Sequence, residues 1–488
     1  MKLKENSRIK QIKKNKPIFA ASIIFTLLFA ALFINVASFL VNDSYDVISS
    51  DYNPRQEILA EQNIRGDILT EDGTVLAITQ TDGGEEARVY PYGPLFAHAV
   101  GYSTYGETGI EDIANMSLVK SNQSISTKVS NDIKGRKDKG DSVICSLNVP
   151  VQETASKAIG VYKGAAIVTE VKTGKIIAMI SKPDFDPNTI KEDWEIVSLD
   201  EETSPLLNRA SQGLYPPGST FKIIDLLEYV KENPDSYDKY TYNCNGYFEY
   251  DGRKIRCYHG TSHGFCDLRR SFAKSCNCSF ANIGVNLDRS AFSGTLNSLL
   301  FGSPLPVDFA YSDSKISITP ETEGSKVVQA SIGQGDSVIT PLHLNLITQA
   351  IANKGVLMKP ILVEKIVSED GDVVKEYKPE VYKRLMSASE AEILTDYMTS
   401  VVEAGTGDFL RNAEYTSAGK TGSAEFGDVK GESHAWFTGF APVEDPEVCV
   451  TVLIEGAGSG GDYAVPIAKR LMDSYFEQYS TENSEESE

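Results

Sequence analysis

The chain has 488 residues, enough for two or three domains with sizeable hydrophobic cores. Its apolar and aromatic contents are those of an ordinary globular protein, and its formal net charge at pH 7 is -21. So acidic a protein is a poor match for nucleic acid, because binding to phosphates needs clustered Lys and Arg side chains.

The N-terminal end has the pattern of a membrane anchor. Residues 1–16 form a basic tail, and residues 17–41 follow without a single charged side chain. At about 1.5 Å per residue, this stretch can span the ~30 Å hydrocarbon core of a bilayer. Basic residues precede it and Asp43 and Asp46 follow it, so we expect the N-terminus in the cytoplasm. The apolar core of a cleaved signal peptide would be shorter, ~7–15 residues. We therefore predict an uncleaved single-pass helix in the cell membrane, with everything from residue 42 on extracytoplasmic.

Residues 42–150 read as short strands and turns. The segment RGDILTEDGTVLAIT, 65–79, places Asp-Gly between two apolar stretches, which is a hairpin signal. GETGIED, 106–112, is typical of a turn that leads into a short helix. This region is predicted to be a β-rich N-terminal pedestal domain.

Residues 151–478 predict an α+β domain. A hairpin of two β-branched strands, GAAIVTEV and KIIAMIS, comes early, and three further strands come late, with helices expected at 219–232, 267–285 and 340–354. Five strands that pair antiparallel and are covered by helices make one sheet with helical layers. An amphipathic helix ends the domain, and the acidic tail 479–488 is expected to be disordered.

Seven cysteines are present, an odd number, and five of them lie between residues 244 and 278. An extracytoplasmic location permits disulfides, and the preferred pair is Cys244–Cys257, which would close a short polar loop. Zinc is the rival interpretation, but it usually needs a C-x₂₋₄-C spacing with His partners, and only Cys276-x-Cys278 comes close. The sequence therefore predicts no metal and no cofactor.

The stretch LYPPGSTFKII, 214–224, places Ser219 and Lys222 one helical turn apart behind a chain break. One interpretation is a Ser that caps a helix and a Lys that faces solvent. The other is a nucleophile with its base, because a serine hydroxyl needs a base to attack a carbonyl. Ser-x-x-Lys occurs seven times in the chain, but only here does Pro-Pro-Gly precede it and an apolar helix follow it.

Two further motifs follow in order. They are Ser275-Cys276-Asn277 and Lys420-Thr421-Gly422, which opens a strand. A second Lys-Thr-Gly at 172–174 sits at a predicted hairpin tip, where turn chemistry explains it. Each motif is weak alone, but the three together, in this order, are those of penicillin-recognising serine acyltransferases.

On these motifs the chain resembles the class B penicillin-binding proteins, which are membrane-anchored D,D-transpeptidases of cell-wall synthesis. Further segments similar to this family occur in the same order: 65–77, 108–112, 181–188, 208–222, 331–344 and 434–442. The resemblance implies the penicillin-binding transpeptidase fold. It also implies an enzyme that cross-links peptidoglycan stem peptides through a serine acyl-enzyme, serves cell shape or division, and is acylated by β-lactams.

The resemblance assigns a role to each motif residue. Ser219 would attack the carbonyl between two D-alanines, Lys222 would take its proton, and Ser275 would relay a proton to the departing D-Ala. Asn277 would hydrogen-bond Lys222 and the substrate amide, while Lys420 would lie behind the group that binds the substrate carboxylate. That substrate-binding group comprises Thr421, Gly422 and Ser423.

Other functions on the same fold are a β-lactamase, a D,D-carboxypeptidase, or a non-catalytic β-lactam sensor or scaffold. A class A β-lactamase needs a deacylating Glu soon after the second motif, and none occurs between Ser275 and Glu321. A cytoplasmic tail of 16 residues is too short for a signalling domain. No glycosyltransferase domain fits into 42–150, so the resemblance implies a SEDS-type membrane glycosyltransferase as partner.

Overall fold

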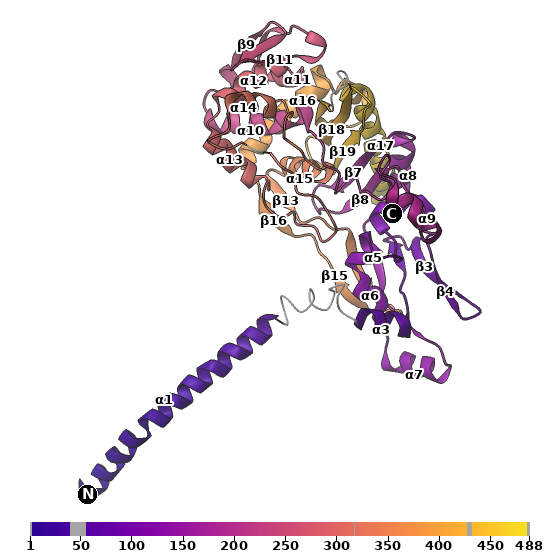
Figure 1. Ribbon diagram of the computed structural model, residues 1–488, viewed down its shortest axis with the longest axis vertical. Helices are drawn as coiled ribbons and strands as arrows, with labels where there is room; N and C mark the ends of the chain where they lie inside the picture. The colour runs from indigo at the N-terminus through magenta and orange to yellow at the C-terminus, as the bar shows by residue number, and fades with distance from the viewer. Residues whose placement is uncertain (1, 40–54, 317, 427–431, 486–488) are drawn as a thin grey trace. The chain divides into compact units, whose positions relative to one another are not determined.

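The computed structural model describes residues 2–39, 55–316, 318–426 and 432–485. The chain divides into two compact units, residues 1–63 and 64–488. In the first, α1 (Lys2–Ser38) contains the uncharged segment Ile18–Ser38, which is long enough to cross a membrane (Figure 1). The Thr26 hydroxyl donates to the Ser22 carbonyl at 2.8 Å, so this polar group is satisfied inside the helix, as an apolar surrounding requires. The last two residues of the predicted span, 40 and 41, lie outside the described residues.

The central sheet of the second unit has five strands in the order β17-β18-β19-β7-β8, all antiparallel. The strands are β7 (Gly164–Glu170), β8 (Ile176–Lys182), β17 (Ala418–Glu425), β18 (Ser433–Ala441) and β19 (Val448–Ile454). The prediction of two early and three late strands in one antiparallel sheet is therefore confirmed.

Helices cover both faces of this sheet. In β19, Cys449 and Leu453 join one hydrophobic cluster, whereas Val450 and Val452 join the other, because successive side chains point to opposite faces. Helix α15 (Pro341–Ala352) covers the first face, and α8 (Val149–Ile159) and α17 (Val465–Glu485) cover the second (Figure 1). A strand buried on both sides typically has a nearly continuous apolar run, and in β19 only Thr451 interrupts it.

The N-terminal β-rich region forms a six-stranded sheet in the order β15-β14-β6-β2-β3-β4. Four strands come from the predicted pedestal, namely β2 (Ile68–Thr70), β3 (Val75–Asp82), β4 (Glu85–Val89) and β6 (Ser142–Cys145). The other two, β14 (Val363–Val367) and β15 (Val373–Glu376), come from far down the chain. A single cut at residue 150 therefore does not separate two independent sheets.

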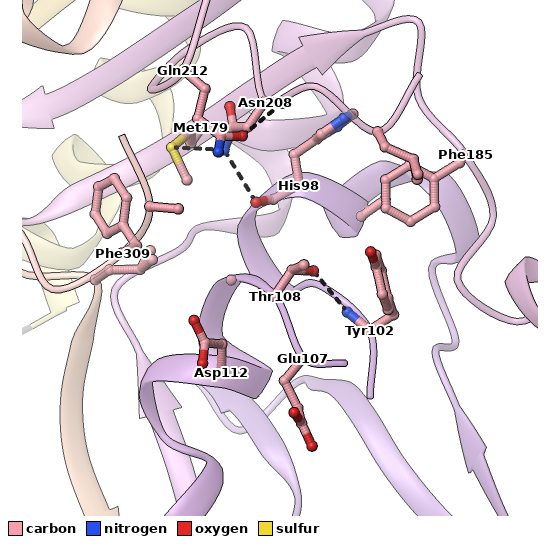
Figure 2. Close-up of a pocket in the computed structure, with 15 residues that line it drawn as sticks. His98, Tyr102, Glu107, Thr108, Asp112, Met179, Phe185, Asn208, Gln212 and Phe309 are labelled. Atoms are coloured by element: carbon pink, nitrogen blue, oxygen red, sulfur yellow. Dashed lines mark hydrogen bonds between the residues drawn. The ribbon is translucent and has the colours of Figure 1, made fainter. Parts of the chain in front are cut away.

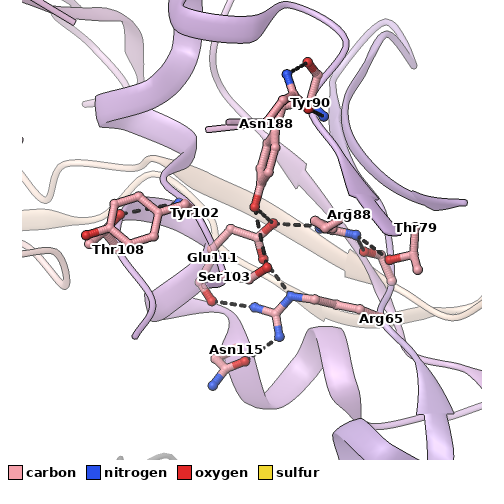
Figure 3. Close-up of polar contacts among 11 residues, drawn as sticks. Arg65, Thr79, Arg88, Tyr90, Tyr102, Ser103, Thr108, Glu111, Asn115 and Asn188 are labelled. Atoms are coloured by element: carbon pink, nitrogen blue, oxygen red, sulfur yellow. Dashed lines mark hydrogen bonds and ion pairs between the residues drawn. The ribbon is translucent and has the colours of Figure 1, made fainter. Parts of the chain in front are cut away.

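A buried carboxylate holds the pedestal together (Figure 3). Glu111, on α5 (Gly109–Ile113), pairs with Arg65 at 2.6 Å and with Arg88 at 2.8 Å, and it accepts from the Tyr90 hydroxyl at 3.1 Å. Burial by itself would raise the pKa of Glu111, but the two guanidinium groups outweigh burial and lower it. The side chain therefore stays charged and links three segments of the pedestal.

Two helical predictions need correction. The expected helix 267–285 is broken: α11 (Leu268–Ala273) ends, Ser275 adopts a left-handed φ of 55°, and α12 (Asn277–Asn286) begins. At the C-terminus, α17 continues through Glu485, where a disordered tail from 479 was predicted. Residues 486–488 of that tail lie outside the described residues.

Candidate active site

Ser219 lies in the 3₁₀ turn Gly218–Phe221, which leads directly into α10 (Lys222–Glu232). Its side chain caps neither element, so the interpretation of Ser219 as a simple helix cap is not supported. The Lys222 Nζ donates to the Ser219 Oγ at 3.1 Å. Lys222 is fully buried, so the interpretation of it as a solvent-facing lysine is wrong.

Glycines allow the turn to pack tightly. Gly218 has a φ of 54°, and its amide donates to the Gly333 carbonyl at 2.9 Å. A Cβ on Gly333 would lie 2.0 Å from the Gly218 carbonyl oxygen. A Cβ on Gly422 would lie 3.1 Å from the Pro217 carbonyl oxygen, closer than nearly all real contacts of this kind. Glycine at these positions lets neighbouring backbones approach the serine turn.

The Lys222 amine is surrounded by acceptors of the second motif. It donates to the Ser275 carbonyl at 2.8 Å, to the Ser275 hydroxyl at 3.2 Å and to the Asn277 Oδ1 at 2.6 Å. Burial lowers the pKa of Lys222 to about 8. Near neutral pH, part of the Lys222 population is therefore uncharged, and in this form the amine can accept a proton.

A second buried amine lies on the other side of Ser275. The Lys420 Nζ, on β17, donates to the Ser275 Oγ at 3.0 Å and to the Thr421 carbonyl at 3.0 Å. Burial, and then the charge of Lys222, hold the pKa of Lys420 well below its ordinary value. The Ser275 hydroxyl thus bridges two lysines, which suits it to pass a proton.

The third motif lies along the edge of the central sheet. Ser219, Ser275 and Asn277 line one cleft together with Thr421 and Ser423 of β17. The Ser423 Oγ accepts from the Gly460 amide at 3.3 Å. The structure therefore brings all three predicted motifs together around one opening.

Sequence reasoning missed other residues of the cleft, including Thr406, whose hydroxyl lies 2.5 Å from the Thr421 hydroxyl. Thr406 stands between two glycines directly after α16 (Ala388–Ala404). That small-residue triplet was the only signal in the sequence, and it does not distinguish a site from an ordinary turn.

A smaller cavity lies elsewhere, between pedestal and transpeptidase segments (Figure 2). Its lining includes His98, Tyr102 and Asp112, and the Asn208 amide donates to the His98 carbonyl at 3.3 Å. Burial lowers the pKa of His98 to about 4, and its Nε2 pairs with the Pro205 carbonyl at 2.8 Å. A neutral histidine bound to a main-chain carbonyl is structural, so this cavity does not compete with the serine cleft.

Two cysteines were predicted to form a disulfide. In the structure Cys244 and Cys257 are both free, and their sulfurs lie 3.7 Å apart. This is far beyond the ~2.05 Å of a disulfide bond.

Comparison with known proteins agrees with this geometry. Residues 164–473 match the penicillin-binding protein transpeptidase domain, and residues 65–143 match the dimerisation domain of penicillin-binding protein A. The peptidoglycan D,D-transpeptidase PbpA of Mycolicibacterium smegmatis is 30% identical over 458 residues, which cover 88% of this chain and 92% of the relative.

Solved structures are similar over most of the chain. The penicillin G acyl-enzyme of penicillin-binding protein A from M. tuberculosis has a TM-score of 0.76 at 27% identity and covers 85% of this chain and 100% of its own. The D,D-transpeptidase domain of a peptidoglycan glycosyltransferase from Eggerthella lenta has a TM-score of 0.78 at 28% identity and covers 86% of this chain and 99% of its own.

The chain therefore belongs to the penicillin-binding protein transpeptidase family. Its combination of dimerisation and transpeptidase domains is that of the class B penicillin-binding proteins.

Proposed function

We propose that this protein is a peptidoglycan D,D-transpeptidase that joins stem peptides through an acyl-enzyme on Ser219 and is acylated there by β-lactams. The observation that carries the proposal is the set of contacts made by the Lys222 amine, which reaches Ser219, Ser275 and Asn277 at 2.6–3.2 Å. A hydroxyl, a buried amine and a second motif in mutual contact are the parts that acyl transfer from a serine requires.

In the first half-reaction, the neutral amine of Lys222 takes the proton of the Ser219 hydroxyl as its oxygen attacks the carbonyl between two D-alanines. The backbone N–H groups of Ser219 and Ser423 would stabilise the oxyanion that forms. The C–N bond then breaks, and the nitrogen of the departing D-Ala takes a proton from the Ser275 hydroxyl. Ser275 recovers a proton from Lys222, which took it from Ser219, and this completes the relay.

The Thr421 and Ser423 hydroxyls would bind the terminal carboxylate of the donor peptide, with Gly422 between them. Lys420 lies directly behind this group, and an arriving carboxylate favours the protonated form of its amine. Substrate binding would therefore favour a positively charged Lys420, although burial disfavours that charge in the free enzyme.

In the second half-reaction, an amine of a neighbouring stem peptide attacks the ester carbon. Its proton passes to Lys222 or Ser275, and the Ser219 oxygen leaves with a proton as the free hydroxyl. If water attacks instead, the peptide is only trimmed. The same residues therefore serve both reactions: attack by an amine gives transpeptidation, and attack by water gives D,D-carboxypeptidation.

The test is labelling of the full-length protein with a fluorescent penicillin. Wild type should be labelled and Ser219→Ala should not, whereas the exposed Ser236, which also begins a Ser-x-x-Lys sequence, should tolerate Ser236→Ala. Label retained by Ser219→Ala would overturn the choice of nucleophile. Incubation with a pair of stem peptides should then give a cross-linked dimer, and a trimmed monomer alone would identify a carboxypeptidase.

The apolar helix, the basic tail before it and the acidic residues after it support a single-pass anchor with a cytoplasmic N-terminus and an extracytoplasmic enzyme. A SEDS-type glycosyltransferase is the proposed source of glycan strands, with the anchor and the pedestal, residues 42–150, as docking surfaces. Protease treatment of intact spheroplasts should cleave the enzyme unit but leave a tag at the N-terminus. Loss of the tag instead would reverse the orientation.

A further inference from the structure

A cluster of cysteines and one histidine lies next to the second motif. Cys244 ends β9 (Thr241–Cys244), Cys257 follows β11 (Arg253–Arg256), His263 precedes β12 (Gly264–Asp267), and Cys276 caps α12. The three sulfurs and one histidine nitrogen all lie within 4.8 Å of one another. Four separate segments thus bring four possible ligand atoms to one point.

The spacing of these atoms fits a tetrahedral metal site. Metal–sulfur bonds of about 2.3 Å and metal–nitrogen bonds of about 2.1 Å, at the tetrahedral angle, place sulfurs about 3.8 Å apart and sulfur and nitrogen about 3.6 Å apart. The Cys257 sulfur lies 3.7 Å from the sulfurs of both Cys244 and Cys276. The Cys244 sulfur lies 3.6 Å from the Nδ1 of His263. These separations are too long for a disulfide and match shared ligands of one ion. The Cys278 sulfur also lies in this cluster, 3.3 Å from that of Cys257. That separation is shorter than the ~3.8 Å expected of two sulfurs on one ion, so Cys278 is not counted among the ligands.

The surroundings of the cluster also suit bound thiolates. The Gly246 amide points at the Cys244 sulfur at 3.4 Å, and the Ser279 amide points at the Cys276 sulfur at 3.4 Å. Such N–H groups orient metal ligands and favour their charged form. All three cysteines are buried, with Tyr242 and Phe248 packed against them.

We propose that Cys244, Cys257, His263 and Cys276 bind one Zn²⁺ ion. Three sulfurs and one imidazole nitrogen in a tetrahedron are a usual donor set of structural zinc sites. The ligands fill all four positions, so the ion holds structure rather than activating water. On binding, the three thiols release their protons to solvent. The expectation of no metal relied on ligands close together in sequence, whereas these ligands meet only in the fold.

The ion would hold the second catalytic motif in place, a consequence that depends on the proposed function. Cys276 stands between Ser275 and Asn277, and Ser275 adopts a left-handed φ of 55° that a serine rarely takes without support. The Asn277 amide donates to the Arg256 carbonyl at 2.9 Å, directly beside Cys257. Through Cys276 and Cys257, the metal would therefore fix both sides of this contact. Cys276 acts as a positioning residue.

The first experiment measures metal content of the full-length protein, purified in detergent without chelator. Elemental analysis should find about one Zn²⁺ per chain in wild type and in Cys449→Ser, which alters a buried cysteine of β19. Cys276→Ser and Cys244→Ser should lose it. Wild type without zinc, or ligand variants that keep it, would overturn the site.

Because ligand variants can fail to fold, wild type supplies a second measurement. Replacement of the ion with Co²⁺ should give the intense thiolate charge-transfer absorption and tetrahedral d–d bands of a three-sulfur, one-nitrogen site. Thiol titration in denaturant should find all seven cysteines free. An octahedral spectrum, or two thiols missing to a Cys244–Cys257 disulfide, would contradict the proposal.

The positioning role is tested by removal and return of the metal. Chelated wild type should react with fluorescent penicillin up to about a hundredfold more slowly, since misplacement of a catalytic group by about 1 Å costs this much. Zn²⁺ should restore the rate in wild type but not in Cys276→Ser, and Mg²⁺ should restore neither. Unchanged acylation after complete zinc loss would refute the positioning role and leave the metal site intact. Failure of the proposed function would instead appear as absence of label in zinc-loaded wild type.

Discussion

The Lys420 amine donates a hydrogen bond to the Ser275 hydroxyl at 3.0 Å, although the two residues are 145 positions apart in the sequence. The same hydroxyl accepts from Lys222 at 3.2 Å. The catalytic centre is therefore a chain of buried polar groups in which each protonation state depends on its neighbours.

Removal of the Ser275 hydroxyl should slow acylation without preventing it. Ser275→Ala breaks the bridge between Lys222 and Lys420, and loss of a positioned proton carrier costs about 10²–10⁴-fold in rate. Stopped-flow measurement of penicillin acylation gives this rate directly. Ser236 is exposed and has no part in this bridge, so Ser236→Ala provides the control. A rate within twofold of wild type would mean that Ser275 carries no proton.

The acylation rate should rise with pH toward about 8. Burial lowers the pKa of Lys222 to about 8, and only its neutral form can accept the Ser219 proton. Below that pKa, the neutral fraction grows about tenfold for each pH unit, and above it the rate should level off. Single-turnover acylation between pH 6 and 9 measures the profile, with thermal unfolding as a check that the fold persists. A profile that falls with pH would assign the base elsewhere.

Lys222→Arg should inactivate the enzyme although it preserves a positive charge. A guanidinium stays protonated at all accessible pH values, so it cannot accept the serine proton. We expect acylation to fall by about 10²–10⁴-fold. The exposed Lys157, paired with Glu153 one turn away on α8, offers the control Lys157→Arg. An active Lys222→Arg variant would show that this lysine acts only through its charge.

A methyl group at Gly333 should displace the nucleophile. In Gly333→Ala the new Cβ would lie 2.0 Å from the Gly218 carbonyl oxygen, so the turn that carries Ser219 must move. A shift of about 1 Å there should reduce acylation about a hundredfold. Gly302→Ala separates this clash from backbone strain, because Gly302 also has a positive φ, 74°, but has no atom within 4 Å of its Cβ position. Equal losses in the two variants would attribute the effect to strain alone.

Removal of the buried carboxylate should destabilise the pedestal. Glu111→Ala leaves Arg65 and Arg88 without their partner, and breaking a buried pair typically costs about 3–5 kcal/mol. Chemical denaturation followed by tryptophan fluorescence measures the loss. Glu153→Ala, which removes the exposed pair with Lys157, should change stability by less than about 0.5 kcal/mol. Comparable effects of the two substitutions would contradict the role of Glu111.

Stability should also depend on Glu111 as pH falls. The pKa of Glu111 is lowered in the folded state, so its contribution is present above the ordinary pKa of a glutamate. It is lost as pH falls through the lower, folded-state value. Glu111→Gln should remove this part of the acid dependence, and denaturation midpoints of both proteins from pH 7 downward would measure it. Parallel acid profiles would mean that other carboxylates dominate.

The sequence alone determined the features that depend on local pattern. The uncharged stretch before residue 42, the apolar run of β19 and the spacing of Ser219 and Lys222 each follow from composition or helical periodicity. The order of the three motifs in the sequence also predicts one active site, because each motif carries its chemistry within a few residues.

Features that depend on long-range packing became visible in the folded chain alone. The fold joined β14 and β15 to the pedestal sheet, broke the predicted helix at Ser275 and brought Cys244, Cys257, His263 and Cys276 to one point. The four ligands are spaced 13, 6 and 13 positions apart, so no short pattern identifies them. Local propensity acts over one turn or one strand, whereas contacts between distant segments are fixed only when the whole core is packed.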